Sequence, residues 1–143
     1  MSTSNAKSDY LEQKIIEAIL KNTSFAGGAN TYVALLTAAG TPESSSVTEV
    51  STGGGSLYAR QAMLAASAWS AGGQVSAAYE VNNAADIVFP IAGTDWGAIT
   101  HFAIYDASTA GNMLYYGQLD TSKTILTGDQ FKFVAGNLKI SES

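Results

Sequence analysis

The chain has 143 residues, of which 46% are hydrophobic and only 13% are charged, and its formal net charge is −5. Seven scattered Lys and Arg residues argue against a nucleic-acid partner, because phosphate contacts are made chiefly by basic side chains. The absence of cysteine excludes disulfides, thiolate metal sites and a cysteine nucleophile. No apolar run approaches the roughly 18 residues of a membrane span, and the N-terminus is too polar for a signal peptide. We therefore expect a soluble, single-domain protein made in the cytoplasm, with no membrane partner.

The first part of the chain predicts an arm followed by a helix. Residues 1–8 are small or polar apart from the initiator, so we expect a flexible arm that is disordered or docks on a neighbour, with the single domain spanning residues 9–143. Asp9 is the expected N-cap, and Glu12 follows at capping-box spacing. The helix is expected over residues 9–22, with an apolar stripe at Leu11, Ile15, Ile16, Ile19 and Leu20. We favour packing of this stripe on the sheet of its own domain over a helix reserved for a partner.

The middle of the chain alternates short strands with turns. Residues 31–38 form a continuous apolar run and predict a central strand, whereas residues 40–55 are polar and without period, as in an interaction loop. Residues 56–66 fit a strand better than a helix. Residues 74–81 alternate weakly, and residues 86–90 predict a short strand stopped by Pro90.

The stretch from residue 95 to residue 119 is the expected centre of the fold. Residues 98–106 and 113–119 predict two strands of a β-hairpin around a small, polar turn. Strict alternation places Ile99 and His101 on one face and Phe102 and Ile104 on the other, so neither face is plainly polar. We expect another sheet to cover one side, and a helix or a neighbouring subunit to cover the other.

Residues 123–126 predict a further short strand, and residues 130–135 and 138–141 predict a terminal hairpin through the Gly136-Asn137 turn. Together the elements predict a mainly β fold, an antiparallel β-sandwich or small barrel with one N-terminal α-helix.

No motif predicts catalysis, a cofactor or a metal. The glycine run at residues 53–55 lacks the Gly-Lys-Ser/Thr of a phosphate loop. His101 is the only candidate for an ordinary general base and lies within an apolar strand, where a hydrogen-bonded or sheet-surface histidine is commoner. Residues 68–72 lack the first glycine of a serine nucleophile elbow. The loop that begins at Asp106 lacks two calcium ligands, and aspartates near strand ends are more simply explained as turn formers.

Several segments in a fixed order carry a family resemblance: TYVALLTA (31–38), a glycine run leading to LYARQAM (57–63), DIVFP (86–90), WGAITHFAIYDASTAGNMLYYGQL (96–119), SKTILTGDQFKF (122–133) and AGNLKI (135–140). Over nearly all of the chain after about Asp9, this set resembles a family of small tailed-bacteriophage virion proteins, often labelled tail or tail-fibre proteins. The resemblance implies a non-enzymatic structural subunit located in the virion, which assembles with capsid or tail proteins and is a homo-oligomer or an assembly subunit. It carries over no catalytic residue.

Our leading hypothesis from the sequence is a capsid decoration, or cement, protein whose arm and 40–55 loop contact neighbouring subunits. A tail or tail-fibre component is the second hypothesis, and a carbohydrate-binding module that uses Trp69 is the third. The residues predicted to contact partners are Ser2, Thr3, Ser4, Asn5, Lys7, Glu43, Ser45, Val47 and Trp69.

Overall fold

The computed structural model describes residues 2–25, 30–41, 46–64 and 66–142, and the side chains from residue 6 onward within these ranges. Strands dominate, as expected. The elements are β1 (Ser2–Lys7), α1 (Asp9–Leu20), β2 (Asn30–Leu36), β3 (Gln61–Leu64), the short 3-10 helix η2 (Ala66–Ala68), β4 (Gly73–Val75), β5 (Ala78–Asn82), β6 (Ile87–Ile91), β7 (Gly97–Tyr105), β8 (Met113–Ile125), β9 (Gln130–Phe133) and β10 (Leu138–Glu142).

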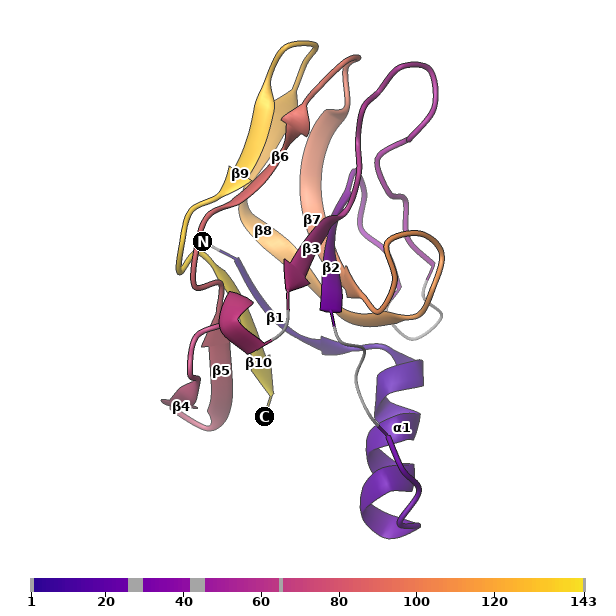
Figure 1. Ribbon diagram of the computed structural model, residues 1–143, viewed down its shortest axis with the longest axis vertical. Helices are drawn as coiled ribbons and strands as arrows, with labels where there is room; N and C mark the ends of the chain where they lie inside the picture. The colour runs from indigo at the N-terminus through magenta and orange to yellow at the C-terminus, as the bar shows by residue number, and fades with distance from the viewer. Residues whose placement is uncertain (1, 26–29, 42–45, 65, 143) are drawn as a thin grey trace.

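The strands form two layers (Figure 1). Eight strands make one sheet in the order β3-β2-β7-β8-β1-β10-β5-β4, and β6 pairs with β9 in a second, small sheet. The described strands close no barrel, so the sandwich-like alternative of the predicted mainly β fold is confirmed. The pairing of β1 with β10 is parallel, unlike the other pairings between the named strands.

The central hairpin is confirmed as β7 and β8, but β8 runs on to Ile125 and absorbs the separate strand expected at residues 123–126. The β7–β8 register shifts between Ile99 and His101. Such a bulge moves the side chains that follow it to the other face. Ile99 consequently joins Phe102 and Ile104 in the main core, in place of the face that strict alternation assigns to it.

The main core fills the space between the two sheets, where Ile99, Phe102 and Ile104 meet Phe89 of β6 and Phe131 of β9. The opposite face of the hairpin carries a smaller cluster of Ala34, Leu36, Ala103, Tyr105 and Met113, with Val47 and Tyr116 packed against it. Residues of the 40–55 loop contribute to the cover of this second face, since Val47 packs against the cluster. The Val50 amide donates to the Leu35 carbonyl at 3.1 Å, and the Thr37 amide donates to the Thr48 carbonyl at 2.9 Å, so this part of the loop runs along β2.

The N-terminal segment differs from the flexible arm expected at residues 1–8, because residues 2–7 form β1 in the interior of the large sheet, between β8 and β10. The helix begins at Asp9 as expected, but its N-cap is Ser8, whose side chain accepts from the Leu11 amide. Ser8 is fully buried, and its hydroxyl also donates to the Met113 carbonyl. The helix start is therefore anchored to the first residues of β8.

The predicted terminal hairpin is wrong. Although both segments are strands, β9 pairs with β6 and β10 pairs with β1 and β5. The buried Asn83 lies at the branch point: its side-chain amide donates to the Val134 carbonyl at 3.1 Å, and its side-chain oxygen accepts from the Leu138 amide at 2.9 Å. Pro90 does not end β6, which reaches Ile91 through a register shift against β9.

Candidate assembly surfaces

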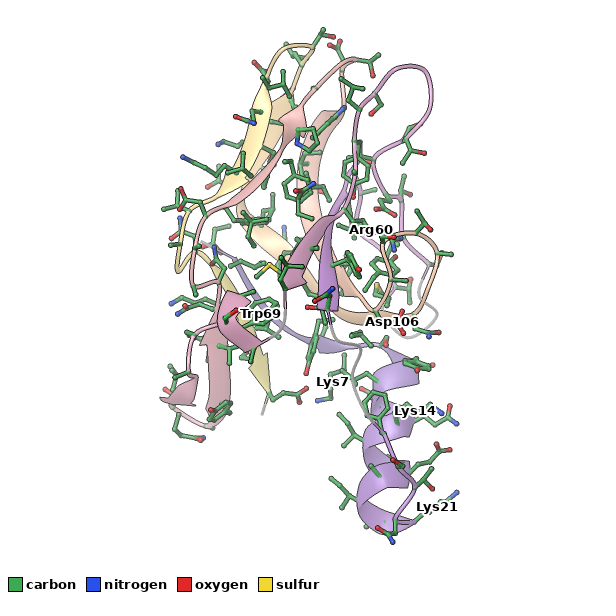
Figure 2. All side chains as sticks on the ribbon, viewed as in Figure 1. Lys7, Lys14, Lys21, Arg60, Trp69 and Asp106 are labelled. Atoms are coloured by element: carbon green, nitrogen blue, oxygen red, sulfur yellow. The ribbon has the colours of Figure 1, made fainter. Side chains whose placement is uncertain are left out.

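The residues predicted to contact partners do not form one surface. The backbone of the segment that contains Ser2, Thr3, Ser4 and Asn5 pairs within the sheet. The Lys7 ammonium lies 2.8 Å from a Glu142 carboxylate oxygen in a partly exposed ion pair (Figure 2 labels Lys7).

The structure describes only one of the three residues of the 40–55 loop that were predicted to contact partners. Val47 is half-buried and packs on the second hydrophobic cluster, so its side chain helps to hold the loop to its own domain. Glu43 and Ser45 lie outside the described residues, and their predicted contacts remain predictions.

Trp69 is half-buried and packs against the main core, while its backbone forms a β-bridge with Asn83. The ring lines a hollow of about 320 Å³ whose walls are almost entirely apolar. Val81, Ile104, Leu114, Tyr115 and Ile140 are among the other lining residues. The Tyr115 hydroxyl is engaged at 2.6 Å with Glu142, and burial, followed by this carboxylate, raises the pKa of that phenol.

The sharpest difference from the expectation concerns α1. Of its apolar stripe only Leu11 is buried, and the helix extends away from the two sheets (Figure 1). Ile16, Ile19 and Leu20 are 55%, 74% and 78% exposed. The stripe was visible in the sequence, but its period alone does not show what covers it.

A further apolar surface lies on the small sheet. Val88 and Ile91 of β6 are exposed, as is Val134, which follows β9. Their neighbours Ile87, Phe89 and Phe133 are buried, so the strands alternate between the core and solvent. Exposed apolar patches can mark a protein contact, so these three residues are candidates for an assembly surface.

An electrostatic cluster centres on Arg60 (Figure 2). Its guanidinium donates twice to Glu49 at 2.9 Å, and it donates to the Ala107 and Ala110 carbonyls at 2.9 and 2.8 Å. It also lies 3.7 Å from the centre of the Tyr105 ring. Burial lowers the pKa of Arg60. The hydrogen bonds to Glu49 and the negative charge of Glu49 raise it, with smaller contributions from two tyrosines, and the net pKa lies above its ordinary value.

The Arg60 cluster is a structural clamp rather than a catalytic pair. Glu49 also accepts a 2.6 Å hydrogen bond from the Tyr58 hydroxyl, which in turn accepts from the Leu35 amide at 3.0 Å. Burial is the largest cause that raises the pKa of Tyr58, followed by the contact with Glu49. Each polar group is already engaged by the chain itself, and the cluster fastens the β7–β8 turn to the 46–60 segment.

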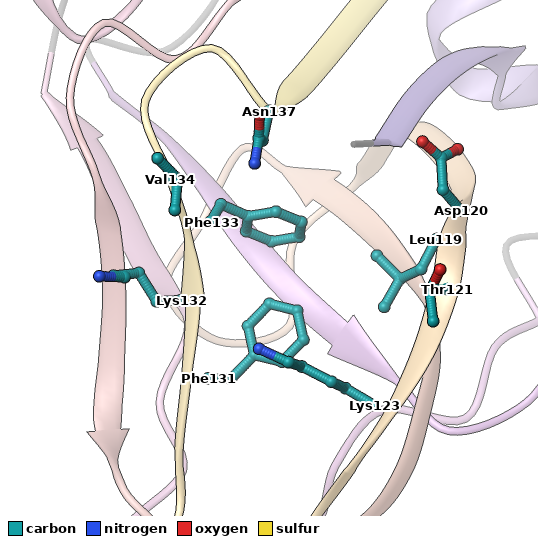
Figure 3. Close-up of a pocket in the computed structure, with 9 residues that line it drawn as sticks. All are labelled: Leu119, Asp120, Thr121, Lys123, Phe131, Lys132, Phe133, Val134 and Asn137. Carbon is teal, nitrogen blue, oxygen red and sulfur yellow. The ribbon is translucent and has the colours of Figure 1, made fainter.

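A second hollow, of about 240 Å³, lies between the last part of β8 and β9 (Figure 3). Phe131 and Phe133 lie at its base, and Lys123 extends across it, with its ammonium 5.9 Å from the centre of the Phe131 ring. Both phenylalanines are buried in the core, so neither presents a free ring face for stacking on a sugar.

The remaining chemical candidates have structural roles. The His101 ring stacks on Tyr116, its Nδ1 lies 2.8 Å from the Thr100 hydroxyl, and burial lowers its pKa. Asp106 binds the Asn112 amide at 2.7 Å, which confirms the interpretation of that aspartate as a turn former. Asp86, Asp95 and Asp129 likewise accept from backbone amides.

Within the described residues, no group of three His, Asp or Glu side chains is arranged to hold a metal ion. No helix in the described ranges has the length and apolarity to cross a membrane.

Outward-facing apolar side chains on a β-rich body, together with polar clusters that hold its loops in place, are typical of a structural assembly subunit. The family described as Podophage GP4 fiber I protein gp80 matches residues 6–141, and the chain belongs to this family. It is therefore a structural protein of a tailed-phage virion. No curated protein matches the chain.

Proposed function

We propose that this chain is a non-enzymatic component of the phage tail fibre. The observation that supports this most strongly is the match over residues 6–141 to a family described as a podophage fiber protein. That description favours the tail-fibre hypothesis over the capsid decoration that was our leading hypothesis from the sequence.

The geometry agrees with a subunit that works by contact. The exposed apolar side chains lie on α1 and on the small sheet, and these surfaces would be covered by other virion proteins or by further copies. The clamped Arg60 cluster suits a rigid subunit, because a body that presents docking surfaces loses less entropy on assembly when its loops are already ordered.

The glycan hypothesis has less support from the structure. The Trp69 ring packs against the core of its own chain and is half-buried. Only part of this one ring is accessible for stacking on a sugar. Binding to a glycan array that Trp69→Ala abolishes, in a variant that stays folded, would restore this function as a candidate.

The test of the tail-fibre proposal is the position of the chain in the particle. Complete virions and tail-less heads of the phage that carries it are purified in parallel, and each is probed with an antibody against the chain. We expect signal from complete virions alone and cryo-electron microscopy density on the tail fibres. Equal amounts per capsid in both preparations, with density at icosahedral positions, would establish decoration and overturn the proposal.

A further inference from the structure

The apolar stripe of α1 and the apolar hollow beside Trp69 are complementary surfaces of the same chain. We propose that α1 of one copy inserts Ile16, Ile19 and Leu20 into the hollow of a second copy. The inference goes beyond the proposed function, since it concerns contact between copies and holds wherever the chain lies in the virion.

The first step of the argument is the incomplete burial of the helix. Positions 16, 19 and 20 are spaced i, i+3 and i+4, so their side chains share one face. Their exposed fractions amount to about two complete aliphatic side chains left in water. Leu11 meets the body of its own domain, but it lies on a neighbouring face of the helix and contributes no cover to the three. The apolar face of α1 is therefore left largely uncovered by its own chain, and it is available to an apolar partner.

The second step is that the hollow has the right chemistry and size. Its walls are mainly aliphatic and aromatic side chains from β5, β7, β8, β10 and the η2 segment, and Thr31 of β2 and Ser70 complete the lining. An apolar cavity of about 150 Å³ accepts a benzene-sized group. A hollow of about 320 Å³ therefore accepts about two large aliphatic side chains, close to the amount that the stripe leaves exposed.

The second copy is the occupant that also explains why α1 points away from its own sheets. The anchoring of Ser8 to Met113 and to the Leu114 carbonyl fixes the helix start beside the hollow of its own chain, and the helix then leads outward from the body (Figure 1). One inserted helix face is small beside the roughly 800 Å² per partner of a standard interface. A reciprocal exchange, in which each copy gives its helix to the other, doubles the contact and closes the pair.

The absence of native cysteine makes disulfide trapping a clean test. Ile19→Cys is placed in one full-length chain and Ala66→Cys in a second chain with a mass tag; Ala66 lines the hollow, is exposed and has a small side chain. The control pair replaces Ala66→Cys by Lys132→Cys on β9, an exposed position outside the hollow. We expect the Ile19–Ala66 heterodimer to form at least tenfold faster than the control pair, and Ile16→Asp to remove this excess while thermal unfolding stays unchanged.

Each contrary result overturns the proposal. If two Ile19→Cys chains cross-link to each other faster than an Ile19→Cys chain cross-links to an Ala66→Cys chain, the helices pair with helices. An Ile19→Cys/Ala66→Cys double variant that oxidises only within one chain would show that α1 folds onto its own hollow. A heterodimer rate equal to that of the control pair would show that the two surfaces do not meet.

Discussion

Replacing Arg60 by Ala tests whether one clamp holds the β7–β8 turn to the body. The change removes two hydrogen bonds to Glu49 and two to the Ala107 and Ala110 carbonyls. The Arg60 side chain is only 8% exposed, whereas Glu49 is 23% exposed and keeps its hydrogen bond from Tyr58. Breaking a fully buried pair costs 3–5 kcal/mol, and the partial exposure of Glu49 brings our expected loss to about 3 kcal/mol.

For a chain of this length, a loss of about 3 kcal/mol lowers the Tm by about 10 °C. The measurement is urea unfolding followed by tryptophan fluorescence, together with calorimetry. The matched control is Lys132→Ala, which breaks an ion pair with Asp86 at 3.8 Å whose side chains are both nearly half-exposed, and which should cost less than about 0.5 kcal/mol.

Arg60→Lys separates charge from shape. A lysine keeps the positive charge but cannot make the forked contact with Glu49 or lie flat on the Tyr105 ring, so it should recover less than half of the loss. A stability of Arg60→Ala equal to that of the Lys132→Ala control would refute the clamp. A fully stable Arg60→Lys would refute the role given to the fork.

Three further predictions concern single positions. Burial lowers the pKa of His101, so the unfolded chain binds a proton at this histidine more readily than the folded chain does. The contribution of the neutral, buried ring to folding stability is therefore fully present above the ordinary pKa of 6.5 and is lost as pH falls below it. His101→Gln should flatten the stability profile between pH 8 and 5, and an NMR titration of the native histidine that gives a pKa of 6.5 or higher would contradict this. Ser8→Ala removes the N-cap of α1 and should cost about 1–2 kcal/mol with a weaker helical signal in circular dichroism, whereas the exposed Ser67→Ala should not. Gly93→Ala would place a Cβ 2.1 Å from the Gly55 carbonyl oxygen and should cost about 2 kcal/mol, while Gly73→Ala, which meets no atom within 4 Å, should stay within about 0.5 kcal/mol of the native protein. Equal unfolding midpoints within either pair of variants would contradict the contact assigned to it.

The elements with strong local signals could be predicted. The central hairpin, the helix and the run at residues 31–38 carry periods and turn residues that act over a few positions. The N-cap is Ser8 and not the predicted Asp9, because Ser8 can reach both the Leu11 amide and the Met113 carbonyl. The second of these contacts depends on tertiary structure. The bulge before His101 has no such local signature, and it reverses the face on which Ile99 lies.

The candidate surfaces were harder to predict because each depends on what the rest of the chain covers. The polar residues 2–7 resemble an arm, yet backbone pairing with two neighbours requires no particular side chains, so a polar segment can complete a sheet. Conversely, the apolar stripe of α1 has the period of a buried helix, but this period does not show whether the stripe is covered by its own chain or by another.

The failed terminal hairpin shows how one buried side chain can override a good turn. Gly136 has a φ of 85°, as a tight turn allows, and the Asn137 amide donates to the Val134 carbonyl at 2.9 Å, so the turn itself is present. The strands nevertheless diverge, because Asn83 binds Val134 on one side and Leu138 on the other and is itself almost fully enclosed. An unpaired amide in that position would cost about 1–3 kcal/mol for each buried partner lost, which favours the arrangement in which Asn83 binds both segments. The chain therefore gives β9 to the small sheet and β10 to the large one, and this division places Ile140 in the wall of the hollow into which we expect a neighbouring helix to insert.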